Sequence, residues 1–262
     1  MGVRIFNSNF LKMYKYCARL FKFFLIVLLI CTAIPLTAQS IKTKVRADSM
    51  LRSLKAIKSH EHSLDALNSL FEFYKNSNDS FSYTVLGIMK SVALKNNDNN
   101  MWAWYYYQRS FFESTLPGNL FLQTIDSSYA KAKAIGNNEL IVRILSVKTM
   151  YLWRNKRYSV ALETSIEALN LSETQQFKNF LPYRYLTTSG IYGSLGDTAR
   201  QYVMALKACE AANLLNDMEA KAYSNGALAN ILAEKKLYDT AIELLHSTMK
   251  WFDILGLRNN VA

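Results

Sequence analysis

The chain contains few prolines, glycines and cysteines. Only three of its 262 residues are proline and nine are glycine, whereas half are hydrophobic. Such a composition is typical of a folded chain rather than a disordered one, and it favours an all-helical fold. Cys17 and Cys31 lie in an N-terminal leader, so Cys209 remains alone after the leader is removed. We therefore expect no intramolecular disulfide and predict that Cys209 is a small core residue.

The leader also lacks acidic residues, since none occurs before Asp48. Basic side chains precede an apolar run from Phe23 to Leu36, which is short for a membrane span of roughly 20 residues. We predict that 1–38 is a secretory signal peptide cleaved after Ala38 or, if uncleaved, an N-terminal anchor. Met13 is an alternative start.

Without the five basic residues of the leader, the formal charge falls from +11 to +6. The remaining charges are scattered, with no block of like charge. Export would also separate the protein from nucleic acid. We therefore expect no direct nucleic-acid binding, and membrane contact only through an uncleaved N-terminal segment.

Three short stretches recur at a spacing of 40 residues, namely Tyr158–Ala161, Thr198–Gln201 and Tyr238–Ala241. Other positions follow the same spacing: small Thr149, Ser189 and Ala229, and large Leu152, Tyr192 and Leu232. A small residue lets two helices approach, and a large one a turn later fills the adjacent gap. One repeat earlier, the large position falls on Phe112 but the small one on Arg109, which indicates a one-residue shift there.

These patterns predict a right-handed α-solenoid of antiparallel helix pairs over 60–256, preceded by a lead helix at 42–58. Asp197 and Asp239 are predicted to cap the helices that follow them. Residues 257–262 match the opening of a further repeat, so we expect the chain to be a fragment or a regulator that has lost its downstream part. The five predicted pairs are 62–76 with 80–96, 100–114 with 118–134, 138–153 with 156–171, 179–194 with 197–214, and 217–234 with 237–254.

This pattern resembles the tetratricopeptide repeat (TPR) family. The stretches Tyr158–Leu162 and Tyr238–Ile242 match the start of the family's second helix, and Ala168 and Ala208 match its later small position. The period is longer than the family's usual 34 residues. The Ala38–Gln39 junction and the Asn- and Asp-rich loops resemble exported repeat proteins of Bacteroidetes-type bacteria. That resemblance implies a periplasmic or cell-surface location in a Gram-negative bacterium.

The family resemblance also implies which side chains meet a partner, because the first helix of each TPR pair lines the concave face. It places Arg143, Tyr183 and Tyr223 in one row, which Tyr106 extends. A second group contains Met150 and Asn230, with Trp153 and Arg154 nearby. Aromatic and arginine side chains suit a protein or extended-peptide partner. The alternative is that these residues serve packing or plain surface.

The sequence contains no catalytic motif, so we expect neither an enzyme nor a cofactor. His60 and His62 lie two apart, which directs them differently on a helix, and we expect no metal there. His246 has no visible partner. Gly190, Gly193 and Gly196 do not have dinucleotide-binding spacing, and close helix packing followed by a turn explains them better.

Three functions remain in order of preference. The first is an exported TPR-like scaffold for a protein or peptide. The second is the periplasmic sensor region of a truncated membrane-bound transcriptional regulator or histidine kinase. The third is a glycan-binding surface protein that uses the aromatic run Met101–Phe112, with Trp102 and Trp104 at its start.

Overall fold

The structure is a computed structural model that describes residues 49, 60–75, 79–116 and 118–256. Over these residues the chain forms helices and turns and no strand, which confirms the predicted all-α class. The predicted signal peptide or anchor at 1–38 lies outside the described residues, as does the start of a further repeat at 257–262. Of the predicted lead helix at 42–58, only Ser49 is described, and it is helical.

The chain divides into two compact units, Met1–Val85 and Leu86–Ala262, and each is described by itself. The described part of the first unit contains α2 (His60–Tyr74) and the beginning of α3 (Asp79–Asn96). The ring of Tyr74 stacks on that of Phe81 with centroids 4.8 Å apart. This contact joins the end of α2 to the start of α3.

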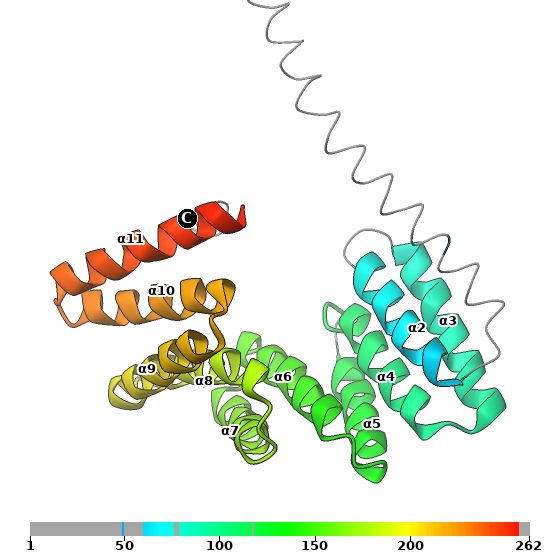
Figure 1. Ribbon diagram of the computed structural model, residues 1–262. Helices are drawn as coiled ribbons and strands as arrows, with labels where there is room; N and C mark the ends of the chain where they lie inside the picture. Colours follow the sequence, from blue (N-terminus) through cyan, green and yellow to red (C-terminus); the bar gives the residue numbers. More distant parts are fainter. Residues whose placement is uncertain (1–48, 50–59, 76–78, 117, 257–262) are drawn as a thin grey trace, which may run out of the picture. The chain divides into compact units, whose positions relative to one another are not determined.

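The second unit contains the rest of α3 and the helices that follow it. Each predicted helical range of this unit overlaps one α-helix, with ends that differ by a few residues, and the range 179–194 also includes part of the short helix η1. From α4 to α11 every α-helix packs against the next, and α8 also contacts α6 and α10 (Figure 1). The helices are α4 (Asn99–Glu113), α5 (Leu120–Ala134), α6 (Asn138–Arg154), α7 (Tyr158–Thr174), the short 3-10 helix η1 (Lys178–Phe180), α8 (Leu181–Ser194), α9 (Thr198–Leu215), α10 (Met218–Glu234) and α11 (Tyr238–Leu255).

The turns between helices repeat every 40 residues in backbone conformation. Lys156, Gly196 and Lys236 all have positive φ, at 57°, 80° and 63°. These three residues follow the first helix of a pair. A second series follows the second helix of each pair and consists of Gly136, Gln176, Asn216 and Gly256. A left-handed residue is a common way to end a helix, because it turns the chain while the last carbonyls stay hydrogen-bonded. The sequence period is therefore a structural period as well.

The predicted one-residue shift is present in the earlier repeat. The left-handed residue there is Asn97, one position later than the series requires. Ser110 is fully buried in the place where the unshifted period would put Arg109. The shift also moves the large position from Phe112 to Glu113, which is buried and accepts a hydrogen bond from Arg109 Nε at 2.6 Å. The prediction of Phe112 for that position was therefore wrong.

The small residues of the repeat lie where helices approach closely. Thr149, Ser189 and Ala229 are all buried. Ser189 Oγ donates to the carbonyl of Gln201 at 2.7 Å, which joins α8 to the backbone of α9. A larger side chain would hold the helices apart and break this bond.

One of the two predicted caps is correct. Asp197 accepts from the backbone N–H of Arg200 at 2.9 Å, as a capping residue does. The prediction for Asp239 was wrong, because α11 begins at Tyr238 and Leu237 occupies the cap position. Asp239 lies instead in the first turn, where its charge interacts favourably with the helix dipole.

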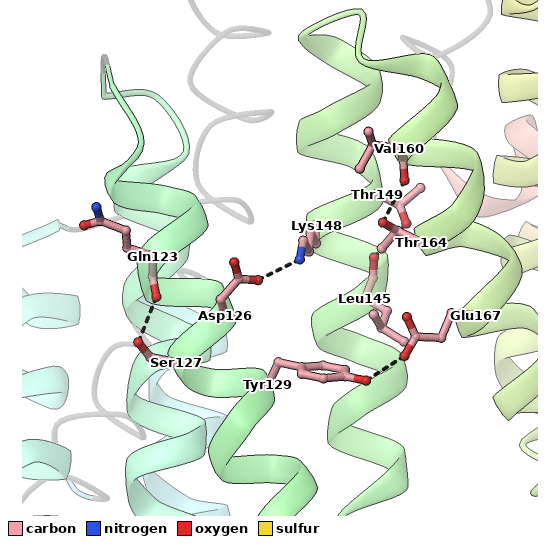
Figure 2. A network of polar contacts seen from close by, with 10 residues as sticks. All are labelled: Gln123, Asp126, Ser127, Tyr129, Leu145, Lys148, Thr149, Val160, Thr164 and Glu167. Atoms are coloured by element: carbon pink, nitrogen blue, oxygen red, sulfur yellow. Dashed lines mark hydrogen bonds and ion pairs between the residues drawn. The ribbon is translucent and has the colours of Figure 1, made fainter.

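Polar contacts tie α5 to both helices of the next pair (Figure 2). Lys148 Nζ on α6 donates to Asp126 Oδ1 at 2.7 Å, and the Tyr129 hydroxyl donates to Glu167 Oε1 on α7 at 2.6 Å. The bond to Glu167, together with burial, raises the pKa of Tyr129 to about 12. These contacts fix the angle between successive pairs in addition to the apolar packing.

Candidate functional site: two adjacent cavities

Two cavities lie in the second unit, and Met150 on α6 lines both of them. We call the first the arginine cavity; its volume is about 510 Å³. The second, which we call the tryptophan cavity, has a volume of about 480 Å³. The arginine cavity is lined by Tyr107, Phe111, Ser114, Phe121, Arg143, Ser146, Val147, Met150, Tyr151, Arg154, Asn155, Phe180 and Arg184. The tryptophan cavity is lined by Met150, Trp153, Leu186, Thr187, Ser189, Gly190, Gln201, Ala227, Asn230, Ile231 and Glu234.

The walls come mainly from the first helix of each pair. Helices α4, α6 and α8 supply most of the arginine cavity, and α6, α8 and α10 most of the tryptophan cavity. Among the predicted site residues, Arg143, Met150 and Arg154 line the first cavity. Trp153 and Asn230 line the second, together with Met150. Five predicted residues are therefore gathered around two adjoining hollows.

Arg143 is held by two contacts. Its Nε and Nη2 donate to Glu139 Oε1 at 3.1 and 2.8 Å, one turn earlier on α6. Its guanidinium also lies 5.0 Å from the ring centre of Phe180, within cation–π range. Glu139 is exposed and does not line the cavity. The side chain is thus oriented while part of its hydrogen-bonding capacity remains available.

The other two arginines of this cavity have no carboxylate partner. Among the described residues, neither Arg154 nor Arg184 forms an ion pair. Arg154 is exposed, whereas Arg184 is largely enclosed and its Nε has no hydrogen-bond acceptor. Burial lowers the pKa of Arg184 to about 10, a shift that the hydroxyl of nearby Tyr107 partly opposes. No Asp or Glu lines the cavity, which is consequently electropositive.

Trp153 forms part of the wall of the tryptophan cavity and also packs against α8. Its indole Nε1 donates to Ser194 Oγ at 2.8 Å, and its ring lies against Gly190. Gln201 similarly contacts Gly193, while Gly196 has a φ of 80° in the following turn. Close packing followed by a turn, as predicted for these glycines, is confirmed.

The remaining predicted residues do not line either cavity. Tyr183 is half-buried. Its pKa is raised to about 12, mainly by burial and to a smaller extent by the negative charges of Asp217 and Glu219. Tyr223 packs edge-on against Phe252 with centroids 5.3 Å apart. Tyr106 stacks on Trp102 with centroids 5.4 Å apart. The row inferred from the family resemblance therefore reaches the arginine cavity only at Arg143.

Sequence reasoning missed Arg184 and most of the aromatic lining. The 40-residue period offered a signal, because Arg184 shares its position in the repeat with Ile144 and Ser224. Both of these residues are buried, so an arginine at the same position of the intervening repeat is unexpected. The sequence analysis singled out the aromatic run, and from it Tyr107 and Phe111, rather than Tyr106, line the cavity.

Of the other candidates from the sequence, the side chains of His60 and His62 lie outside what the structure describes, whereas His246 and Cys209 are described. In the described part of the chain, no group of three or more His, Cys, Asp and Glu residues is placed to hold a metal ion. His246 is exposed. Cys209 is buried, and burial raises the pKa of its thiol to about 11, as suits an unreactive core residue. Within the described ranges, no helix has the length and apolar character of a membrane span.

No family model matches the chain, and a search of the curated proteins found no match.

Proposed function

We propose that this protein is an exported, TPR-like α-solenoid that captures a protein or an extended peptide along the first helices of its repeats. The repeated 40-residue backbone, the short turns and the packing of each helix on the next support the solenoid. The basic leader with its apolar run supports export to the periplasm or cell surface. Binding would proceed by surface recognition without covalent chemistry.

The observation that carries this proposal is the pair of cavities that share Met150 as a lining residue. An extended peptide presents side chains at regular intervals along its length, so neighbouring hollows can each accept one. The lining combines aromatic, methionine and arginine side chains, which are frequent anchors or adaptable contacts in binding surfaces. The right-handed solenoid would extend this row of hollows from one repeat to the next.

A peptide library displayed on phage tests the proposal on the full chain. Peptides enriched by the wild-type protein should bind the Met150→Lys variant at least about tenfold more weakly. The substitution places a charge at a residue that lines both cavities. Val203→Lys is the matched control, since Val203 is exposed on α9 and lines neither cavity. Equal binding to all three proteins would refute peptide recognition at this surface.

A sensor region of a longer membrane-bound regulator is the second candidate, and α11 favours it. Tyr238, Ile242, Leu245 and Met249 form an exposed apolar stripe along that helix. In a stack of repeats, such a stripe would be covered by the following pair. A reading frame that continues past Ala262 in the source DNA and encodes a further helix pair would support this candidate, whereas a stop codon there would oppose it.

A further inference from the structure

The arginine cavity has two kinds of wall. Aromatic rings form the first, with Tyr107 and Phe111 from α4, Phe121 from α5, and Phe180 from η1. Arg143, Arg154 and Arg184 form the second, and they come from the two neighbouring first helices α6 and α8. The lining thus combines cationic donors with flat apolar surfaces, and the guanidinium of Arg143 lies over the ring of Phe180.

The smaller polar groups of the lining are already satisfied by backbone carbonyls. Ser114 Oγ donates to the carbonyl of Phe111 at 2.8 Å, and Asn155 Nδ2 to that of Tyr151 at 2.8 Å. Ser146 Oγ likewise donates to the carbonyl of Val142. These three side chains are therefore already hydrogen-bonded within the protein, and the arginines are the charged donors of the lining.

Of the three arginines, Arg184 gives the strongest indication that the cavity accepts an anion. Its Nε is buried without an acceptor, and no carboxylate among the described residues pairs with it. A buried cationic donor left in this state lowers stability, whereas an anion beside it would restore the lost hydrogen bonds and charge balance. The lowered pKa of the group has the same physical origin.

We propose that the arginine cavity binds a small organic anion: a carboxylate or sulfonate carried on an apolar, ring-containing body. The anionic group would lie against Arg184, with Arg143 and Arg154 beside it, and the body would pack against the aromatic wall. The volume of about 510 Å³ falls within the range of small-molecule sites. This ligand would be held within one cavity, so the inference goes beyond the peptide surface and does not depend on it.

Two dyes with nearly the same ring framework provide the test. Anilinonaphthalene sulfonate is anionic, whereas phenylnaphthylamine lacks the sulfonate, and the fluorescence of each rises in an apolar site. The full chain should bind the sulfonate at least about tenfold more tightly than the neutral dye. Arg184→Gln should remove most of that preference, while Arg184→Lys should retain part of it.

Arg157→Gln is the matched control, since Arg157 is exposed at the turn after α6 and lines neither cavity. It should leave both affinities unchanged. In the unsubstituted protein, the methyl resonances of Val147, which lines the arginine cavity and not the tryptophan cavity, should shift when the sulfonate binds. The location of the ligand then does not depend on how any variant folds. Equal affinity for both dyes, no binding, unmoved Val147 methyl resonances, or an Arg157→Gln effect equal to that of Arg184→Gln would each overturn the proposal.

Discussion

The indole of Trp153 on α6 lies so close to Gly190 on α8 that no other residue fits there without movement. A Cβ atom built on Gly190 would lie 2.3 Å from Trp153 Cη2 and 2.7 Å from its Cζ2. This contact joins the first helices of two successive pairs. It also places the indole in the wall of the tryptophan cavity, so packing and the shape of the site depend on the same glycine.

Gly190→Ala should therefore destabilise the protein. The added methyl must displace a large ring in a packed contact, at a cost of about 1–3 kcal/mol. Gly87→Ala is the control, because nothing lies within 4 Å of a Cβ atom there and alanine favours a helix. Urea unfolding should show opposite signs for the two variants. A neutral Gly190→Ala would mean that the indole moves aside without loss.

Arg184→Met should stabilise the ligand-free protein although Arg184 belongs to the proposed anion site. The substitution removes a buried, unpaired cation while filling similar space, which we expect to raise the free energy of unfolding by about 1–3 kcal/mol. Arg154→Met should change it by less than about 0.5 kcal/mol, because Arg154 is exposed. Thermal and urea unfolding measure both. A large loss with Arg184→Met would show that the cation is compensated in the folded state.

The free energy of unfolding should fall as the pH rises above about 9, because the raised pKa of the Cys209 thiol acts first and the tyrosines follow from about pH 10. The pKa values of Tyr129, Tyr183 and Tyr185 are all raised, by hydrogen bonds to carboxylates and by burial. The folded protein then keeps protons that the unfolded chain releases, which favours unfolding. Arg184 acts in the opposite direction, since its lowered pKa makes the unfolded chain bind the extra proton.

Three tyrosines and Cys209 outweigh one arginine, so the net slope is negative. Urea unfolding between about pH 9 and about pH 11 should show it. Tyr129→Phe should make the decline shallower by removing one of the raised pKa values, whereas Arg184→Met should make it steeper by removing the opposing group. A flat profile, or the same slope in all three proteins, would contradict these assignments.

The apolar stripe on α11 should cause self-association. Ile242 and Met249 are both about half exposed, at 51% and 50%, and they lie on one face of the helix. Contiguous exposed apolar surface of this kind promotes association in water. Sedimentation velocity should show concentration-dependent oligomers that disappear in Ile242→Glu with Met249→Glu. Val160→Glu with Val203→Glu, at single exposed sites, should leave them in place.

The 40-residue period made the helices predictable because it records packing that every repeat shares. Small residues such as Thr149 and Ala229 are required wherever two helices approach, so their recurrence marks the same contact each time. Even the shift at Arg109 was visible, since Ser110 follows it directly. The prediction of a cap at Asp239 was wrong because the capping residue is set by where the helix begins. A difference of one or two residues in the helix start assigns the cap to another residue.

The candidate site was less predictable because a cavity is defined by departures from the repeat. Arg143, Met150 and Arg154 were found from the first-helix surface, but Arg184 was passed over for its neighbour Tyr183. A rotation of one residue on a helix changes the direction of a side chain by about 100°. That is enough to move Tyr183 away from the cavities and bring Arg184 into one. Only the helix packing seen in three dimensions resolves that choice.

Photocrosslinking tests the proposed function most directly. A benzophenone amino acid would replace Phe111 in the arginine cavity, Asn230 in the tryptophan cavity, or Val203 outside both. One library-selected peptide should crosslink at both Phe111 and Asn230 and not at Val203, since the proposed extended ligand would span both cavities, which share Met150 as a lining residue. Crosslinks at Val203, or none at either cavity position, would contradict recognition along the first helices.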